Sequence, residues 1–224
     1  MKKPVVTIDG PAGSGKSTTA KRVARKLGYT YLDTGAMYRA MTVKALKTGI
    51  DLGDPDALAR QARETDIAIR PDPDGTRVIL DGIDVTDEIR TPEVTQASSP
   101  VSAAEGVRKR MVELQRQVGE GGGIVAEGRD MGSVVFKDAE VKIYLDASLA
   151  CRAARRKKEL EAAGTLVDFD NMEKDIESRD AYDSSREHSP LVIPEGSIIV
   201  DTTDMTIEDQ VDRVIQEVKK RTGE

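Results

Sequence analysis

The sequence predicts an α/β fold in which a doubly wound parallel sheet carries two excursions. Three observations predict it. Short apolar runs of strand length alternate with longer segments of helical periodicity along most of the 224 residues. A glycine-rich turn joins the first apolar run to the first helical segment. Between residues 65 and 85 the alternation stops, and β-favouring runs follow one another across tight turns.

The first elements have clear boundaries. Pro4–Asp9 is rich in β-branched residues, which predicts a buried strand, and Gly10 ends it. Lys16–Leu27 has the pattern of a helix that Gly28 closes. A short strand, Tyr29–Leu32, is expected next.

The next helix is expected to begin at the turn Asp33-Thr34-Gly35 and to run to about Lys47, before Gly49. The runs "DIAIR", "RVILDG" and "IDV" then predict short strands, with turns at "PDPDG" and "DG". Such strands pair in an antiparallel ribbon. Because the ribbon interrupts the strand–helix alternation, it indicates an inserted subdomain.

The second half of the chain returns to the alternation. Val107, Met111, Leu114 and Val118 lie on one helical face and predict a helix over Ser102–Val118. The remaining predicted elements are the strands Ile124–Ala126, Val141–Asp146 and Ser197–Thr203, the helices Ala147–Ala163 (ended by Gly164) and Asn171 to about Ser185, and a last helix with a capping box at Thr206 and Asp209.

Composition narrows the function. The chain is 38% hydrophobic, enough for one packed domain with insertions or for two small ones. Aromatic residues make up only 3% and tryptophan is absent, so base stacking on aromatic rings is not expected as a main binding mode. The net charge of −6 repels nucleic acid, and any polyanion must therefore meet a local cluster of arginine and lysine.

Rare residues exclude other chemistries. The only cysteine, Cys151, cannot form an internal disulfide, and the single histidine, His188, leaves no Cys/His cluster for zinc. Neither a nucleophile elbow nor a papain-like signature accompanies His188, and we expect it to have no catalytic part. No apolar run approaches the ~18 residues of a membrane helix, and "MKKPVVTIDG" does not resemble a signal peptide. We expect a soluble, cytoplasmic protein that binds neither nucleic acid nor membrane.

The glycine-rich turn carries the strongest motif. Gly10-x-x-x-x-Gly15-Lys16-Ser17 matches the P-loop pattern, with a strand before it and a helix after it. In such a loop, backbone N–H groups and the helix N-terminus hold phosphates, the lysine reaches the β- and γ-phosphates, and the serine hydroxyl ligates Mg²⁺. A simple glycine turn is a poor alternative because motif and context agree. Asp9 is interpreted as a strand-end residue.

The kind of P-loop protein depends on what else is present. The chain has one asparagine, Asn171, so the Asn-Lys-x-Asp motif of GTPases is missing, as is the LSGGQ-like signature of transporter ATPases. Arg39 and the pair Arg129–Asp130 are expected at the carboxyl edge of the sheet, where ligands of open α/β sheets bind. Each arginine alone fits a surface ion pair, but together they favour a second anion site.

Two further rows of charge occupy single helical faces. The first is Arg152, Arg155 and Arg156; the second is Arg179, Asp183 and Arg186. By themselves, both rows are interpreted as solvated helix surface. Transfer of a phosphoryl group between two polyphosphates needs cationic clamping and exclusion of water rather than a general base, and this arginine-rich pattern fits that reaction.

At this point the sequence resembles the bacterial cytidylate kinases, which are nucleoside monophosphate kinases, over nearly the whole chain. The resemblance is carried by "IDGPAGSGKST", "YLDTGAMYRA", "VTQASSPVSAAEGVRKRMVELQR", "IVAEGRDMGSVVF", "KIYLDASLACRAARR", "SRDAYDSSREHSPL" and "VDTT". It implies a P-loop NTP hydrolase-like core over residues 1–224, an inserted monophosphate-binding subdomain at about 34–105 and a helical lid at about 152–190. It further implies ATP-dependent phosphorylation of CMP and dCMP, by a protein that we expect to be monomeric.

The resemblance also implies roles for individual residues. ATP phosphates are bound by Gly10, Pro11, Ala12, Gly13, Ser14, Gly15, Lys16, Ser17 and Thr18. CMP is bound by Thr34, Arg39, Ser99, Arg108, Arg129, Asp130, Arg179, Asp183 and Arg186. The groups that act on the transferred phosphoryl are Lys16, Arg39, Arg129, Arg152 and Arg156. Arg152, Arg155 and Arg156 belong to the lid. Mg²⁺ is held by Ser17, with Glu127 through water.

Some assignments stay open. Thr34 stands where the family also has serine, and Glu127 where it often has aspartate. Ser98 and Ser102 flank Ser99, so the ribose contact can belong to a neighbour. Two other functions remain as alternatives: another small-molecule P-loop kinase, such as a shikimate or gluconate kinase, and a nucleotide-binding module without catalysis.

Overall fold

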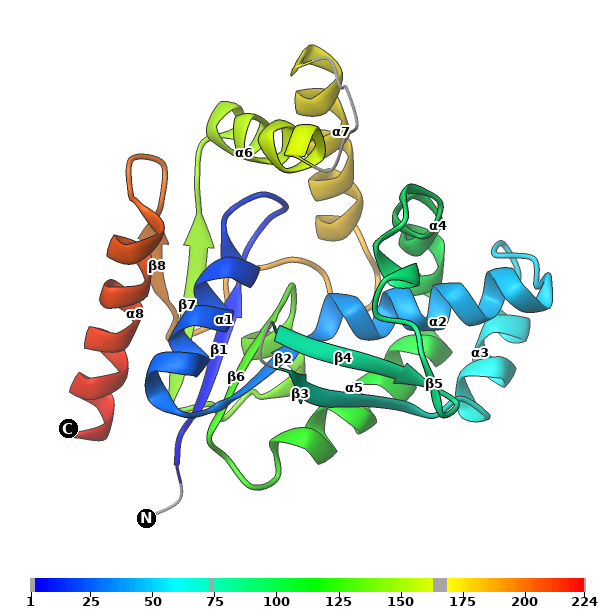
Figure 1. The fold of residues 1–224 in the computed structure, drawn as a ribbon, viewed down its shortest axis with the longest axis horizontal. Helices are drawn as coiled ribbons and strands as arrows, with labels where there is room; N and C mark the ends of the chain where they lie inside the picture. Colours follow the sequence, from blue (N-terminus) through cyan, green and yellow to red (C-terminus); the bar gives the residue numbers. More distant parts are fainter. Residues whose placement is uncertain (1–2, 73–74, 163–168, 224) are drawn as a thin grey trace. The chain divides into compact units, whose positions relative to one another are not determined.

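The structure is a computed structural model that describes residues 3–72, 75–162 and 169–223 (Figure 1). Its contacts divide the chain into two compact units. The first comprises residues 1–3 and 30–124, and the second comprises residues 4–29 and 125–224. The expected helix end at Ala163 and Gly164, and the centre of the "PDPDG" turn, lie outside the described residues.

The second unit is built on a sheet. Its strands are β1 (Val5–Asp9), β6 (Ile124–Gly128), β7 (Val141–Asp146) and β8 (Ile198–Asp201). They lie side by side in the order β6-β1-β7-β8. The pairings of β1 with β7 and of β7 with β8 are parallel, with Ile8 opposite Ile143 and Ile143 opposite Ile198. The central side chains Val6, Ile8, Ile143 and Leu145 are fully buried, as expected of strands covered on both faces.

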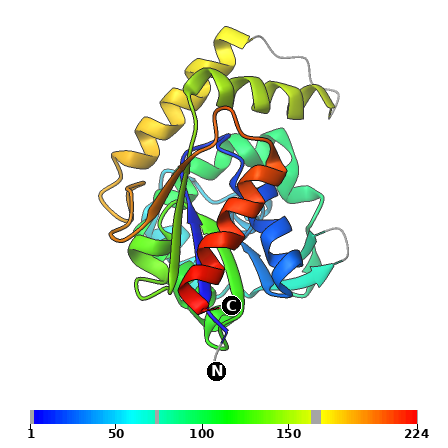
Figure 2. The same cartoon turned by 90° about the vertical axis from the view of Figure 1, so that its left-hand side faces the viewer.

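Helices connect and cover these strands. They are α1 (Lys16–Leu27), α6 (Leu149–Ala162), α7 (Phe169–Ser184) and α8 (Ile207–Thr222), and a single π-helical turn, η2 (Met131–Val135), follows β6. Helix α1 packs on α8, and α6 packs on α7 at one end of this unit (Figure 1, and Figure 2 from the side). The predicted capping box of α8 is present, with Thr206 and Asp209 bonding reciprocally.

The first unit contains the predicted antiparallel ribbon. Its three strands are β3 (Ile67–Asp72), β4 (Gly75–Leu80) and β5 (Ile83–Asp84), paired in that order. The unit also holds the short strand β2 (Thr30–Asp33) and α2 (Thr34–Thr48), within a residue or two of the predicted bounds. The parallel sheet and the antiparallel ribbon are therefore both confirmed.

Three more helices complete the first unit: α3 (Pro55–Arg63), α4 (Pro92–Ala103) and α5 (Glu105–Gly119), with a 3₁₀ turn, η1 (Glu88–Arg90), before α4. The sequence prediction missed α3 and α4, although each starts with a capping residue and a proline at its first turn, Asp54-Pro55 and Thr91-Pro92. Ser102 belongs to α4, not to the start of α5, because Ala104 is extended and separates the two helices.

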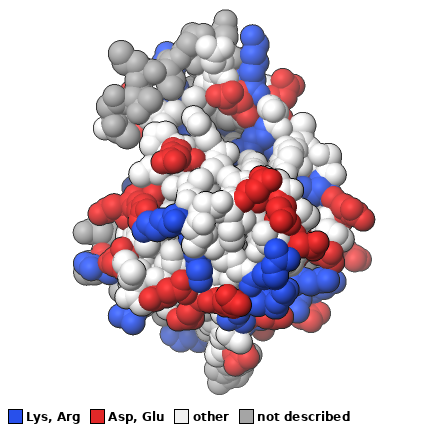
Figure 3. Space-filling model, turned by 90° about the vertical axis from the view of Figure 1, so that its right-hand side faces the viewer, with Lys and Arg blue, Asp and Glu red and all other residues white. Residues whose placement is uncertain are grey.

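The surface carries charge of both signs. Figure 3 shows one face, on which basic and acidic side chains are interspersed. Within the described part of the chain, no helix has the length and apolar character needed to cross a membrane.

Candidate active site

The phosphate loop, residues 10–17, lies between β1 and α1. Gly10 has φ +148° and Gly13 has φ +75°, both in the region that favours glycine. Neighbouring atoms also leave no room for a side chain at either glycine. A Cβ on Gly10 would collide with the carbonyl oxygen of Leu145, and one on Gly13 would lie 2.9 Å from the carbonyl oxygen of Arg152. The loop therefore packs directly against β7 and α6, which fixes the course of its backbone.

Lys16 is buried beneath this loop, with only 5% of its surface exposed. Its Nζ donates to the carbonyl oxygen of Pro11 at 2.5 Å and to Ser14 Oγ at 3.4 Å. Burial, followed by the charge of Arg129, lowers the pKa of Lys16 to about 7, although nearby carboxylates including Glu127 oppose this shift. An anion bound in the loop would favour the charged form of this ammonium group.

The first turn of α1 faces solvent. Ser17 and Thr18 are exposed, and no acidic residue occupies this turn. The partial positive charge of the helix N-terminus is therefore not offset locally, as suits a site for anions.

Asp9 does more than end a strand. The side chain is fully buried, and its two oxygens accept backbone N–H bonds from Met131 at 2.7 Å and Gly132 at 2.8 Å. These are the first two residues of η2, directly after Arg129 and Asp130. Burial raises the pKa of Asp9 to about 7 in spite of the two hydrogen bonds. No local pattern predicts these two hydrogen bonds, because Met131 and Gly132 are 122 and 123 residues away from Asp9.

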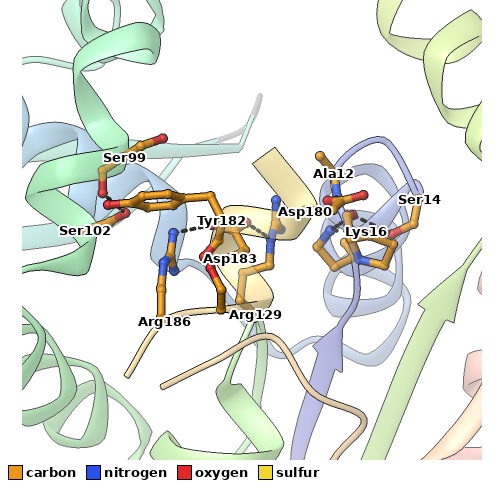
Figure 4. Close-up of polar contacts among 12 residues, drawn as sticks. Ala12, Ser14, Lys16, Ser99, Ser102, Arg129, Asp180, Tyr182, Asp183 and Arg186 are labelled. Atoms are coloured by element: carbon orange, nitrogen blue, oxygen red, sulfur yellow. Dashed lines mark hydrogen bonds and ion pairs between the residues drawn. The ribbon is translucent and has the colours of Figure 1, made fainter. Parts of the chain in front are cut away.

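Asp183 of α7 contacts two predicted arginines, Arg129 and Arg186. Arg129 Nε donates to Asp183 Oδ2 at 2.8 Å, and Arg186 Nη2 donates to Asp183 Oδ1 (Figure 4). Asp183 is only 2% exposed. Burial raises the pKa of this carboxyl, but the charges of Arg129 and Arg186 outweigh burial and hold it below its usual value. We call these three residues the arginine cluster.

The prediction that Arg179, Asp183 and Arg186 form solvated helix surface is wrong. Asp183 is buried because the chain after α7 folds back over it, and Leu191 N–H donates to its carbonyl oxygen at 2.9 Å. The Arg186 guanidinium lies 5.5 Å from the centre of the Tyr182 ring. Arg179 is half-buried on the same helix and contributes to the low pKa of Asp183.

The row on α6 is also less solvated than predicted. Arg152 is 9% exposed, and its guanidinium donates to the carbonyl oxygens of Ala147 and Ala12, each at 3.0 Å. Arg152 further pairs with Asp180 of α7, a residue that the sequence analysis did not single out. The one available signal was its position within "SRDAYDSSRE", one turn before Asp183.

The other two arginines of this row differ from Arg152. Arg155 donates to Thr202, to Oγ1 at 3.0 Å and to the carbonyl oxygen at 2.6 Å, and Thr202 in turn donates to the carbonyl oxygen of Ser14. Arg156 pairs with Glu159 at 3.0 Å in an exposed ion pair, the arrangement expected of a helix surface.

The remaining predicted residues lie in the first unit. Thr34 is buried at the start of α2. Asp33 caps this helix by accepting from Ala36 N–H at 2.8 Å and pairs with Arg39 at 3.2 Å. The ion pair that the sequence left open for Arg39 is therefore present, with 24% of the arginine side chain exposed.

Arg108 and the serines of α4 share a neighbourhood. Arg108 is 3% exposed, donates to the carbonyl oxygen of Ser102 at 2.9 Å and lies 5.2 Å from the centre of the Tyr38 ring. Ser98 Oγ donates to the carbonyl of Thr95 and Ser102 Oγ to that of Ser99. Both flanking hydroxyls are thus engaged with their own helix.

The second unit therefore brings together a phosphate loop, a buried lysine and arginines held by buried carboxylates, which defines a P-loop kinase. The fold is similar to that of shikimate kinase from Acinetobacter baumannii, with a TM-score of 0.51 at 14% identity over 99% of this chain and 96% of that one.

Sequence comparison gives the family. The cytidylate kinase family matches residues 6–220. Cytidylate kinase from Caldanaerobacter subterraneus subsp. tengcongensis is 49% identical over 217 residues, 97% of this chain and 95% of that protein. Cytidylate kinase from Geobacillus kaustophilus is 46% identical over 218 residues, 97% of each. The chain belongs to the cytidylate kinase family, and the resemblance inferred from its motifs is confirmed.

Proposed function

We propose that this chain transfers the γ-phosphoryl group of ATP to CMP or dCMP by direct in-line displacement, giving ADP and CDP or dCDP. One observation carries the proposal. The buried Lys16 donates to the Pro11 carbonyl of the phosphate loop, and Arg152 of α6 donates to the Ala12 carbonyl of the same loop at 3.0 Å. Two cationic groups from separate segments thus occupy one neighbourhood, as transfer between two anionic groups requires.

On the donor side, the proposal assigns the phosphate loop and α1 to ATP. Backbone N–H groups from Gly10 to Thr18 hold the phosphates, and Lys16 stabilises charge on the transferred group. Arg152 and Arg156 act on the same phosphates. The contact of Arg152 with the Ala12 carbonyl at 3.0 Å supports this role because it keeps one guanidinium beside the loop.

On the acceptor side, Arg39 and Arg129 are assigned to the phosphate of CMP. The cytosine is read by Thr34, Arg108, Asp130 and Arg186, and the ribose is held by Ser99, Arg179 and Asp183. An amino donor and a carbonyl acceptor on cytosine match a carboxylate and an arginine. Among the three serines of α4, Ser99 is favoured because the hydroxyls of Ser98 and Ser102 already donate to helix carbonyls.

The acceptor phosphate is itself an anionic nucleophile, so no residue has to remove a proton. The protein has to hold donor and acceptor in line, neutralise the charge that they share and keep water away. The ordered ion pairs of the arginine cluster favour this because they fix guanidinium groups before the substrate arrives.

Magnesium is part of the proposal. Within the described ranges, no group of three or more histidine, cysteine or acidic side chains has the spacing of a metal site. Mg²⁺ bound through ATP phosphates, water and one protein hydroxyl needs no such group, and the exposed Ser17 offers that hydroxyl. Glu127, 5% exposed, would act through water. The ion would supply charge neutralisation of the phosphates.

A single acceptor panel tests the function. ADP release is followed with ATP and each of CMP, dCMP, UMP, AMP and shikimate, with and without EDTA. We expect turnover with CMP and dCMP that exceeds turnover with AMP and shikimate at least a hundredfold and that EDTA abolishes. Turnover with shikimate instead would support the first alternative, and tight ATP binding without ADP release for any acceptor would support the second.

The same proposal includes a monomer that works in the cytoplasm, where its nucleotide substrates are found. Size-exclusion chromatography with light scattering at assay concentration tests the first part, and a mass near 24.3 kDa is expected.

A further inference from the structure

Helix α7 carries two carboxylates one turn apart that contact different parts of the site. Asp183 holds Arg129, as described above. Asp180, three residues earlier, contacts the phosphate loop and α6 (Figure 4). Residues at this spacing lie on the same face of a helix. Neighbouring turns of α7 thus reach the loop assigned to the donor and the arginine assigned to the acceptor.

Asp180, Arg152 and Ala12 form a closed set of contacts. Asp180 Oδ1 accepts from Ala12 N–H at 3.0 Å, and Asp180 Oδ2 accepts from Arg152 Nη1. The same Nη1 donates to the carbonyl oxygen of Ala12 at 3.0 Å. The carboxylate and the guanidinium therefore bind both polar groups of one loop residue. Their side chains are only 17% and 11% exposed, so solvent screens the pair weakly.

Packing supports the same arrangement. The Ala12 side chain packs against the apolar cluster of Ala153, Met172 and Ile176 between α6 and α7. Gly13 lies against Arg152, and a Cβ there would be 3.0 Å from the Arg152 Cβ. No side chain separates the loop from α6 at this point. The position of Ala12 is consequently set by α6 and α7 as well as by the loop itself.

We propose that Asp180 is a positioning residue, which acts by holding the Arg152 guanidinium at the phosphate loop in one orientation. An arginine side chain has many rotamers, and a fixed carboxylate partner removes this freedom before the transition state forms. Because the role of Arg152 toward the transferred phosphoryl belongs to the proposed function, this inference rests on that function. Asp180 itself touches neither substrate.

The first test compares three variants. Asp180→Asn keeps the shape and one acceptor oxygen for Ala12 N–H but loses the charge that orients Arg152. Asp180→Glu keeps the charge and moves it by one carbon. Asp175→Asn makes the same chemical change at an exposed position of α7 and is the control. We expect kcat to fall 10- to 100-fold in Asp180→Asn and about tenfold in Asp180→Glu, with KM for CMP within threefold of wild type. Asp175→Asn should stay within twofold for both constants.

The decisive test is a double-mutant cycle with Arg152→Met. If Asp180 acts through Arg152, the double variant loses no more kcat than Arg152→Met alone, because the group that Asp180 positions is already gone. Losses that multiply, or an Asp180→Asn enzyme with wild-type kcat, would overturn the proposal. Should Asp180→Asn fail to fold, the cycle is run with Asp180→Glu, whose unchanged charge protects the fold.

Failure of the proposed function has a different signature. If wild type transfers phosphate to an acceptor other than CMP, the substrate assignment is wrong, and the cycle is run with that acceptor. If wild type transfers phosphate to no acceptor, both proposals fail together.

Discussion

The phosphate loop and the arginine cluster are both built around charge, but in different ways. The loop is eight consecutive residues whose backbone is fixed by glycines and by close packing on β7 and α6. The cluster joins Arg129 to Asp183, 54 residues further along the chain, and adds Arg186. The loop is local and its ligand-binding groups are mostly backbone. The cluster is non-local and consists of side chains.

The electrostatics differ in sign as well. Among the residues that the structure describes, Lys16 donates to a carbonyl and a hydroxyl, and burial disfavours its charge. Asp183 lies between two guanidinium groups that favour its charge. The Lys16 charge is thus compensated only by carboxylates that it does not hydrogen-bond, while the charges of the cluster are paired directly. Removing the Lys16 charge from the loop should therefore affect mainly catalysis. Removing the Asp183 charge from the cluster should affect both CMP binding and protein stability.

The largest effect is expected for Lys16→Met. Loss of one preorganised charge that stabilises the transition state reduces kcat by roughly 10²- to 10³-fold or more. Since the buried ammonium is unfavourable in the free protein, the melting temperature should stay the same or rise. ADP release in the presence of CMP and a thermal melt provide the measurements. Lys137→Met, at an exposed lysine, is the control. A kcat near that of wild type would show that Lys16 does not have the assigned role.

Asp183→Asn should produce a smaller kinetic effect and a clear loss of stability. The variant leaves two guanidinium groups close together without the carboxylate that orients them. We expect KM for CMP to rise about 10- to 100-fold with KM for ATP within threefold, and unfolding to become easier by about 1–3 kcal/mol in urea. Glu208→Gln is the control, because it weakens exposed ion pairs with Arg22 and Lys26 and should cost at most about 1 kcal/mol. Equal rises in both KM values would contradict the separation of loop and cluster.

The difference between a local loop and a non-local cluster explains which parts of the site the sequence predicted correctly. The loop, its flanking strand and its helix were predicted to the residue or nearly so, because motif, strand pattern and capping glycine all lie within a short window. The row Arg179, Asp183 and Arg186 was misread as solvated surface. Helical spacing alone cannot tell which face a later segment covers, and here Leu191 and its neighbours cover it.

Asp9 and Asp180 show the same limit. Both act on backbone groups that are 122 and 168 residues away, Met131 for Asp9 and Ala12 for Asp180. No periodicity or local motif marks such a pair. Membership of the cytidylate kinase family, by contrast, was carried by contiguous stretches such as "EGRDMG", which include Arg129 and Asp130 whatever their contacts are.

The smallest expected effect is a pH dependence of stability that lies in different pH ranges at the two regions. At the loop, Lys16 has a pKa of about 7 when folded and 10.5 when unfolded, so between these values the unfolded chain binds more protons. The Lys16 contribution to stability is therefore fully present above pH 10.5 and is lost as pH falls toward 7. For Asp9, raised from 3.8 to about 7, the folded chain binds more protons between these values, and its contribution is lost as pH rises toward 7. Together, Lys16 and Asp9 should lower the free energy of unfolding most near neutral pH.

The cluster responds to pH only in the acid range. The pKa of Asp183 is lowered from 3.8, so its contribution is present above that value and lost as pH falls through the folded pKa. Urea unfolding of wild type, Lys16→Met and Asp183→Asn from pH 3 to 10 separates the two. The free energy of unfolding of Lys16→Met should exceed that of wild type at pH 7, because the folded protein holds the pKa of Lys16 at about 7, below the 10.5 of the unfolded chain. This excess should shrink toward pH 10, whereas the deficit of Asp183→Asn should hold at neutral pH and shrink only below pH 4. Differences that do not change with pH would mean that neither charge is linked to folding, and the contrast between the buried Lys16 charge and the directly paired cluster would be wrong.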